Sequence, residues 1–272
     1  MGCTNRVDRS GAAPRQARHS FGRFGLVVTA RLLGECDSRL RLACGVGASV
    51  GSVLNVRPEL ADHPDRRRWN ARYTGDFAVS FAAHPLMVAA LARLLPEGPV
   101  LDLACGPSGS ALLAAATGRR VTAVDVSDAA LSLLAEAACR RGMTGLVSLV
   151  HADLAAWRPQ PGSYAVVLCT GYWDRDLFPA AADAVTAGGV LGWEAFTAGA
   201  RLMRPDLPEA WVLGTGEPAS LLPPGFETLS QQELPDARAG AKRRLMARRG
   251  PGDPRSGSRP QLSVALRGFS SR

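Results

Sequence analysis

The stretch Val100-Leu-Asp-Leu-Ala-Cys-Gly-Pro-Ser-Gly109, followed by Val121-Thr-Ala-Val-Asp-Val126, decides the fold of this chain. A short apolar run breaks into a glycine-containing turn, and an apolar, alanine-rich segment (110–116) comes next. This order predicts a strand, a turn and a helix, the layout that points backbone N–H groups and a helix N-terminus at a ligand. The second piece is another β-branched run, and it ends on an acid.

The two acids at these strand ends, Asp102 and Asp125, are 23 residues apart. In doubly wound nucleotide-binding folds, a carboxylate about 20 residues past the glycine turn holds the ribose hydroxyls, so we expect an adenosine-type cofactor here. A dinucleotide site would need G-x-G-x-x-G, and the turn offers only Gly106 and Gly109. A carboxylate at Asp102 repels a pyrophosphate but suits a ligand with an ammonium or sulfonium group.

The stretch VLDLACGPSG resembles the first motif of class I S-adenosylmethionine-dependent methyltransferases, and Val-Asp-Val-Ser resembles their second. The resemblance spans roughly residues 69–249 and departs from the usual glycines at Ala104 and Ser108. Alanine is small enough to leave room, and Ser108 fits if its φ angle is negative. The resemblance implies an α/β fold, a Rossmann-like doubly wound sheet of seven strands, mostly parallel with the last strand antiparallel.

The same resemblance implies S-adenosylmethionine as the cofactor and assigns roles to the strand ends. Asp125 would hold the ribose, Asp102 would approach the methionine part, and Asp153 would accept from the adenine amine, with Val126 and Leu154 beside the ring. The fourth strand would end where the methyl group faces its acceptor. The expected cofactor-binding residues are Asp102, Ala104, Cys105, Gly106, Ser108, Gly109, Asp125, Val126, Asp153, Leu154, Cys169 and Thr170.

The acceptor side carries a weaker signal, and no catalytic residue is identified. The cluster Trp69-Asn-Ala-Arg-Tyr73 resembles the N-terminal cap of small-molecule methyltransferases of the tellurite-resistance type. The Asp/Asn-Pro-Pro-Tyr mark for base amines and a Pro-Cys nucleophile for cytosine are both absent from the sequence. We therefore expect a small-molecule acceptor, with candidate substrate or cap residues Trp69, Arg72, Tyr73, Tyr172 and Trp173, and with Trp193 and Glu194 near by.

Two alternative functions keep the same fold. The chain would then be a non-catalytic, regulatory protein that binds S-adenosylmethionine, or an aminopropyl transferase that uses the decarboxylated cofactor. Aminopropyl transferases typically carry paired acids after the fourth strand, which Asp174 and Asp176 faintly resemble. A dehydrogenase of the short-chain type is disfavoured because no Tyr-x-x-x-Lys pair exists, Lys242 being the only lysine.

Runs of β-branched residues alternate with helical patterns along the rest of the chain, which predicts a parallel sheet covered by helices. Pro85 begins one helix, in which Met87, Ala90, Leu91 and Leu94 share a face. Ser127 caps the helix that follows Asp125. Further strands are expected at 146–151, 164–169, 190–196, 226–233 and 243–248, and a further helix at 178–187, which ends at Gly188-Gly189.

The charge of +8 is unevenly distributed along the 272 residues. Residues 1–68 hold 12 arginines against 6 acids, 69–236 hold 10 against 17, and 237–272 hold 10 basic residues against 1 acid. An acidic core argues against nucleic acid as a partner. We expect a disordered basic extension at 1–57, a cap and helix at 58–96, the cofactor-binding domain at 97–249 and a flexible basic tail at 250–272.

No apolar stretch reaches the roughly 18 residues that a membrane span needs, and no secretory signal is evident. We therefore expect a cytoplasmic protein without a membrane partner. The six cysteines form no C-x-x-C pair and do not cluster with the four histidines, so we expect no metal site. The sequence does not indicate an oligomeric state.

Overall fold

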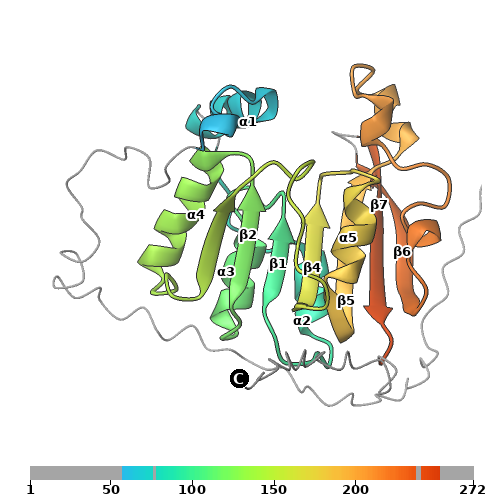
Figure 1. Cartoon of the computed structure of the whole chain (residues 1–272). Coiled ribbons are helices and arrows are strands. Elements are labelled where there is room, and N and C mark those ends of the chain that lie inside the picture. The colour runs from blue at the N-terminus through green and yellow to red at the C-terminus, as the bar shows by residue number, and fades with distance from the viewer. Residues whose placement is uncertain (1–56, 76–77, 237–239, 252–272) are drawn as a thin grey trace, which may run out of the picture. The chain divides into compact units, whose positions relative to one another are not determined.

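The computed structural model describes residues 57–75, 78–236 and 240–251. The expected disordered extension and basic tail lie outside these residues, apart from their edges, and remain predictions. The described part holds a seven-stranded sheet in the order β3-β2-β1-β4-β5-β7-β6 (Figure 1). The strands are β1 (Val100–Leu103), β2 (Val121–Asp125), β3 (Val147–His151), β4 (Tyr164–Thr170), β5 (Val185–Phe196), β6 (Phe226–Asp236) and β7 (Gly240–Arg249).

Strands β1 to β5 pair in parallel, whereas β7 lies antiparallel to both β5 and β6. This arrangement confirms the predicted Rossmann-like sheet with an antiparallel last strand. Parallel order brings the carboxyl ends of β1 to β5 to one edge of the sheet, and the reversal of strand order between β1 and β4 opens a crevice there. The fold thereby fixes where a ligand site can form.

Helices cover both faces of the sheet (Figure 1). One face packs against α2 (Pro85–Leu91), α3 (Gly109–Ala116) and α4 (Asp128–Arg140) through a buried cluster that includes Met87, Leu112 and Leu134. The other face packs against α5 (Leu177–Asp183), where the rings of Trp173 and Phe178 each meet Trp193 edge to face. Short 3-10 turns complete the fold at η1 (Pro58–Leu60), η2 (Ala198–Leu202), η3 (Glu209–Trp211) and η4 (Ala219–Leu221), and α1 covers Pro64–Thr74.

Two predicted elements were wrong in detail. The helix expected over 178–187 ends at Asp183, and Val185 already pairs with Tyr164 in the sheet. Gly188, with φ of +76°, and Gly189 lie at an irregularity inside β5 rather than at a helix end. A Cβ at Gly189 would lie 2.8 Å from the carbonyl oxygen of Ala165, so this position has no room for a side chain. The helix after Pro85 stops at Leu91, so Leu94 is 91% exposed instead of packing on the sheet.

The turn between β1 and α3 explains both departures from the usual glycines. Ala104 adopts φ of +49°, the left-handed region that costs a side-chain-bearing residue about 1 kcal/mol. Ser108 has φ of −76°, and its hydroxyl accepts a hydrogen bond from the amide of Ala111 to cap α3. The same hydroxyl donates to the carboxylate of Asp102 at 2.5 Å.

Asp102 is 2% exposed, and its burial, opposed by the Ser108 hydrogen bond and reinforced by the charge of Asp125, raises its pKa to about 7. The folded chain therefore binds a proton at Asp102 that the unfolded chain releases near pH 4. This contribution to stability is fully present below pH 4 and is lost as the pH rises through about 7.

We predict that Asp102→Asn removes this loss, since an amide oxygen still accepts from Ser108 and carries no charge. The free energy of unfolding of the variant, relative to the wild type, should rise between pH 5 and pH 8 by an amount on the order of 1–3 kcal/mol. Urea titrations at several pH values measure it. Asp183→Asn, on the surface, is the control, and parallel curves for Asp102→Asn and wild type would contradict the raised pKa.

A second prediction concerns Gly109, which begins α3. A Cβ at this position would lie 2.2 Å from the carbonyl oxygen of Phe81, because the segment before α2 crosses the helix start closely. Gly109→Ala should therefore destabilise the fold by about 1–3 kcal/mol. Gly145→Ala is the matched control, since nothing lies within 4 Å of its Cβ position. Equal melting temperatures for the two variants would show that the segment yields easily.

Candidate functional site

A cavity of about 810 Å³ opens at the carboxyl ends of the parallel strands. Its floor comes from the turn after β1 and from the ends of β2, β3, β4 and β5. Its roof comes from α1 and from the segment between β5 and β6. The floor residues are Ala104, Cys105, Gly106, Pro107, Asp125, Val126, Asp153, Leu154, Thr170, Gly171, Tyr172, Trp173 and Phe196, and the others are His63, Asp65, Arg68, Trp69, Arg72, Tyr73, Ser80, Arg204, Leu207 and Trp211.

The carboxylate of Asp125 ends β2 and is held by two backbone amides. The amide of Gly106 donates to Oδ2 at 2.8 Å, and the amide of Ser127 donates to Oδ1 at 2.8 Å. Burial raises the pKa of Asp125, and the amide hydrogen bonds oppose this rise by favouring the charged form. Each carboxylate oxygen can accept more than one hydrogen bond. The group is therefore oriented by the backbone and still able to accept from a ligand in the cavity.

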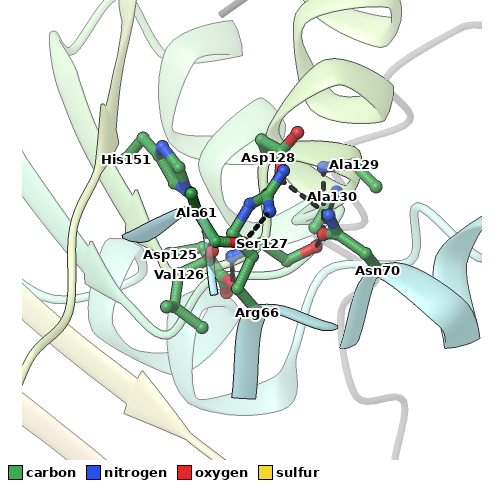
Figure 2. Close-up of polar contacts among 10 residues, drawn as sticks. All are labelled: Ala61, Arg66, Asn70, Asp125, Val126, Ser127, Asp128, Ala129, Ala130 and His151. Atoms are coloured by element: carbon green, nitrogen blue, oxygen red, sulfur yellow. Dashed lines mark hydrogen bonds and ion pairs between the residues drawn. The ribbon is translucent and has the colours of Figure 1, made fainter. Parts of the chain in front are cut away.

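Helix α1 is fixed to the start of α4 by a set of polar contacts (Figure 2). Asn70 donates to the carboxylate of Asp128 at 2.7 Å and accepts from the hydroxyl of Ser127 at 2.7 Å. Arg66 donates to the same Asp128 oxygen at 2.7 Å. Burial alone would raise the pKa of Asp128, but the Arg66 and Asn70 hydrogen bonds outweigh it and lower the pKa. These contacts place α1 over the residues that follow β2.

Docked in this way, α1 lays Tyr73 against the glycine turn. A Cβ at Gly106 would lie 3.0 Å from the hydroxyl of Tyr73, and Gly106 has φ of +56°, so a side chain is disfavoured there twice over. Burial, with a smaller effect from the charge of Asp125, raises the pKa of Tyr73 to about 12. The Trp69 ring stacks on Tyr73 with centroids 6.0 Å apart.

The second part of the roof, the segment between β5 and β6, is held by two arginines, one just before α5 and one on β7. Arg175 donates to both carboxylate oxygens of Glu217, at 2.9 and 2.8 Å, and Arg243 donates to the carbonyl oxygens of Gly214 and Glu217. The two parts of the roof meet where the guanidinium of Arg68 lies 5.6 Å from the Trp69 ring and 5.4 Å from the Trp211 ring. Cation–π contacts therefore join α1 to η3 above the cavity.

The acceptor candidates after β4 have different environments. Tyr172 lines the cavity and donates to Asp174 at 3.4 Å, and burial followed by the Asp174 charge raises its pKa. Trp173 also lines the cavity, although it is only 3% exposed. Trp193 and Glu194 do not reach the cavity lining. Trp193 is buried against α5, and Glu194 pairs with His84, Lys242 and Arg244.

Thirteen of the predicted site residues line the cavity, and four lie behind it. Asp102 and Ser108 bond to each other beneath the turn, Gly109 faces the backbone of Phe81, and Cys169 is fully buried. Asp102 therefore lies behind the cavity lining, and its role toward a cofactor stays a prediction. The residues that sequence reasoning missed are mainly in the roof: His63, Asp65, Arg68, Ser80, Phe196, Arg204, Leu207 and Trp211.

Asn70 is a further residue without a sequence signal, because one asparagine in a polar helix resembles any other. The arginines and the tryptophan that sequence reasoning missed in the roof lie in segments without helical or strand periodicity. The sequence pattern therefore gave no means of placing their side chains at the cavity. Across the described ranges, no group of three or more His, Cys, Asp or Glu side chains is placed to hold a metal ion. No helix among the described elements is long and apolar enough to cross a membrane.

Comparison with known proteins bears on this site. Residues 100–189 match a family model described as a methyltransferase domain. A curated relative from Paracidovorax citrulli, named trans-aconitate 2-methyltransferase, is 36% identical over 117 residues, which are 40% of this chain and 42% of the relative. The chain thus matches less than half the length of that relative.

Solved structures share the fold at low sequence identity. Magnesium protoporphyrin IX methyltransferase from Synechocystis, solved with bound S-adenosylhomocysteine, aligns with a TM-score of 0.52 at 18% identity, over 68% of this chain and 98% of that one. Phosphoethanolamine N-methyltransferase 2 from Haemonchus contortus, in complex with S-adenosylmethionine, aligns with a TM-score of 0.51 at 14% identity, over 68% and 56%.

TehB from Haemophilus influenzae aligns with a TM-score of 0.50 at 19% identity, over 68% of this chain and 66% of that one. At these identities the structural likenesses establish the fold alone. The match to the family model covers the strand, the glycine turn and the ends of β2, β3 and β4, which build the cavity floor. Residues 100–189 thus resemble a methyltransferase domain, and the fold around them is one that solved methyltransferases share.

Proposed function

We propose that this chain transfers a methyl group from S-adenosylmethionine to a small-molecule acceptor. The observation that carries the proposal is the carboxylate of Asp125, which two backbone amides orient at the end of β2 inside a roofed cavity. A carboxylate held in this way accepts hydrogen bonds from the two hydroxyls of a ribose. The family match over residues 100–189 supports the same cofactor.

The described residues fit this cofactor. Asp125 would accept from the ribose, and Asp153 would accept from the adenine amine between Val126 and Leu154. The turn that contains Gly106 offers a close approach to the backbone, while Thr170 lies at the end of β4. The cofactor supplies a methyl group on a positively charged sulfonium, which is electrophilic without further activation. The chain must then bind the cofactor and the acceptor, orient them toward each other and exclude water.

The shape of the cavity favours a small acceptor. Its volume of about 810 Å³ lies within the range of small-molecule sites, and α1 and the segment between β5 and β6 cover it from two sides. The name of the curated relative, which acts on trans-aconitate, points in the same direction. Tyr172 and Trp173 follow β4 and line the cavity, and they are our candidates for contact with the acceptor.

The aminopropyl alternative gains no support from its two acids. Asp174 accepts from the amides of Asp176 and Leu177 and so begins α5, and neither Asp174 nor Asp176 lines the cavity. The non-catalytic alternative differs from our proposal in one observable respect. A regulatory protein would bind S-adenosylmethionine without producing S-adenosylhomocysteine.

We predict that the full chain, incubated with methyl-labelled S-adenosylmethionine and a metabolite extract, releases S-adenosylhomocysteine and labels small molecules. Asp125→Asn should weaken cofactor binding about 10- to 100-fold, the effect of losing a hydrogen bond to a charged group. Calorimetry measures the dissociation constant. Asp183→Asn, an exposed acid remote from the cavity lining, is the matched control. Unchanged affinity in a folded Asp125→Asn variant would refute the proposed site.

We also propose that α1 acts as a cap over the cofactor, with Asn70 as the residue that positions it. Asn70→Ala removes the contacts to Ser127 and Asp128, so amide exchange over 64–74 should accelerate and cofactor affinity should fall about tenfold. Adding cofactor should restore part of the protection. Hydrogen–deuterium exchange detected by mass spectrometry measures both effects.

Arg67→Ala is the control for the cap, because Arg67 lies on the same helix, donates a hydrogen bond to Asp62 and does not line the cavity. If protection over 64–74 is high without ligand and does not change on binding, α1 is a fixed part of the fold and the cap proposal is wrong.

A further inference from the structure

The charged residues that line the cavity differ between its sides, and this difference bears on the acceptor. Asp125 ends β2, and Asp153 follows β3 and lies 3.5 Å from His63. Helix α1 contributes Asp65 together with Arg68 and Arg72. The β4–β5 side contributes no acid and no histidine to the described lining. Its lining residues are Thr170, Gly171, Tyr172, Trp173, Phe196, Arg204, Leu207 and Trp211.

Arg204 is the charged side chain on that side of the cavity. Its guanidinium lies 5.0 Å from the centre of the Phe196 ring, and within the described residues it makes no hydrogen bond or ion pair. The backbone around it is ordered by local contacts, since its amide donates to Ala200 at 3.0 Å and Leu207 donates to its carbonyl at 3.0 Å. Ala200, Leu207 and Val212 form a small buried cluster beneath this loop.

A half-buried arginine on a packed loop, with aromatic neighbours and no acidic partner, is suited to a planar anion. Arg68 adds a second positive charge at the roof, between Trp69 and Trp211. If the proposed function holds, the cofactor brings another positive charge on its sulfonium. A neutral or cationic acceptor would leave Arg204 without a counter-charge on its own side of the cavity, whereas an anionic acceptor supplies one.

On the same side of the cavity, the described lining offers no group suited to removing a proton from the acceptor. Tyr172 is its only described lining residue with an acid–base side chain other than arginine, and burial raises its pKa, so it does not serve as a base near neutral pH. An alcohol or an ammonium group would need such a base. A carboxylate needs none, because it is already an anion at neutral pH.

We propose that the acceptor is a carboxylate, bound by Arg204 with help from Arg68, and that the product is its methyl ester. This inference rests on the proposed function and names the substrate class of the same cavity. One carboxylate oxygen forms a bond to the methyl carbon as the carbon–sulfur bond breaks, and the bonding pair remains on sulfur. The products are a methyl ester and S-adenosylhomocysteine, and no proton is transferred.

The test uses the full chain, methyl-labelled S-adenosylmethionine and a metabolite extract, and does not require the acceptor to be known. Labelled products are treated with alkali, which releases labelled methanol from esters but leaves methyl groups on nitrogen, sulfur or carbon in place. We expect alkali-labile label. trans-Aconitate and cinnamate serve as defined probes, with cinnamamide as the uncharged counterpart that should not be methylated.

Arg204→Gln should lower the rate of ester formation at low acceptor concentration at least about tenfold, mainly through KM. The dissociation constant of the Arg204→Gln variant for S-adenosylmethionine should stay within about twofold of the wild-type value. Arg204→Lys should recover part of the activity, because it restores the charge but not the planar fork. Arg201→Gln is the matched control, since Arg201 lies on the same segment, contacts Glu209 and does not line the cavity.

The outcomes separate the two proposals. If the chain does not bind S-adenosylmethionine, or binds it and labels nothing, the proposed function fails and this inference fails with it. If label is transferred but is stable to alkali, the methyltransferase proposal stands and the carboxylate inference is wrong. Alkali-labile label that Arg204→Gln forms as fast as Arg201→Gln would remove Arg204 from the acceptor site.

Discussion

The site depends on one constraint, the pair of backbone amides that holds the carboxylate of Asp125. Gly106 can donate one of them only because the turn adopts left-handed backbone at Ala104 and at Gly106 itself. Ser127 donates the other and, through its hydroxyl, caps α4 and bonds to Asn70 of α1. A single carboxylate therefore fixes the turn after β1 and the start of α4. Through Ser127 and Asn70 it is also linked to α1, the helix that roofs the cavity.

The arrangement has an electrostatic cost. Asp102 and Asp125 are both buried near the same turn, and the charge of Asp125 adds to the burial that raises the pKa of Asp102. Two buried acids beside the same turn oppose folding at neutral pH. A cationic ligand bound beside them would favour their charged forms and stabilise the folded chain. Two of the acids that make residues 69–236 negatively charged therefore lie buried at the ends of β1 and β2.

Sequence reasoning succeeded where local patterns determine structure. β-Branched runs located the strands, and Ser127 and the acid of Asp125 were placed correctly because capping and strand-end positions have their own residue preferences. It failed where tertiary contacts override such signals. Gly188 and Gly189 resembled a helix end but lie within β5, and Leu94 matched a helical period but is exposed. The positive φ of Ala104 is invisible in sequence because alanine rarely adopts it.

The floor and the roof of the cavity also differ in their position relative to the matched family domain. The matched family domain, 100–189, supplies the turn after β1 and the ends of β2, β3 and β4. The roof comes from residues on either side of it, with Arg68, Trp69 and Tyr73 before the domain and Arg204 and Trp211 after it. A common floor binds the common cofactor, whereas side chains that face an acceptor must vary with that acceptor. Similarity within the domain therefore informs the chemistry of the methyl donor, and the choice of acceptor has to be read from the arginines and aromatic rings of the roof.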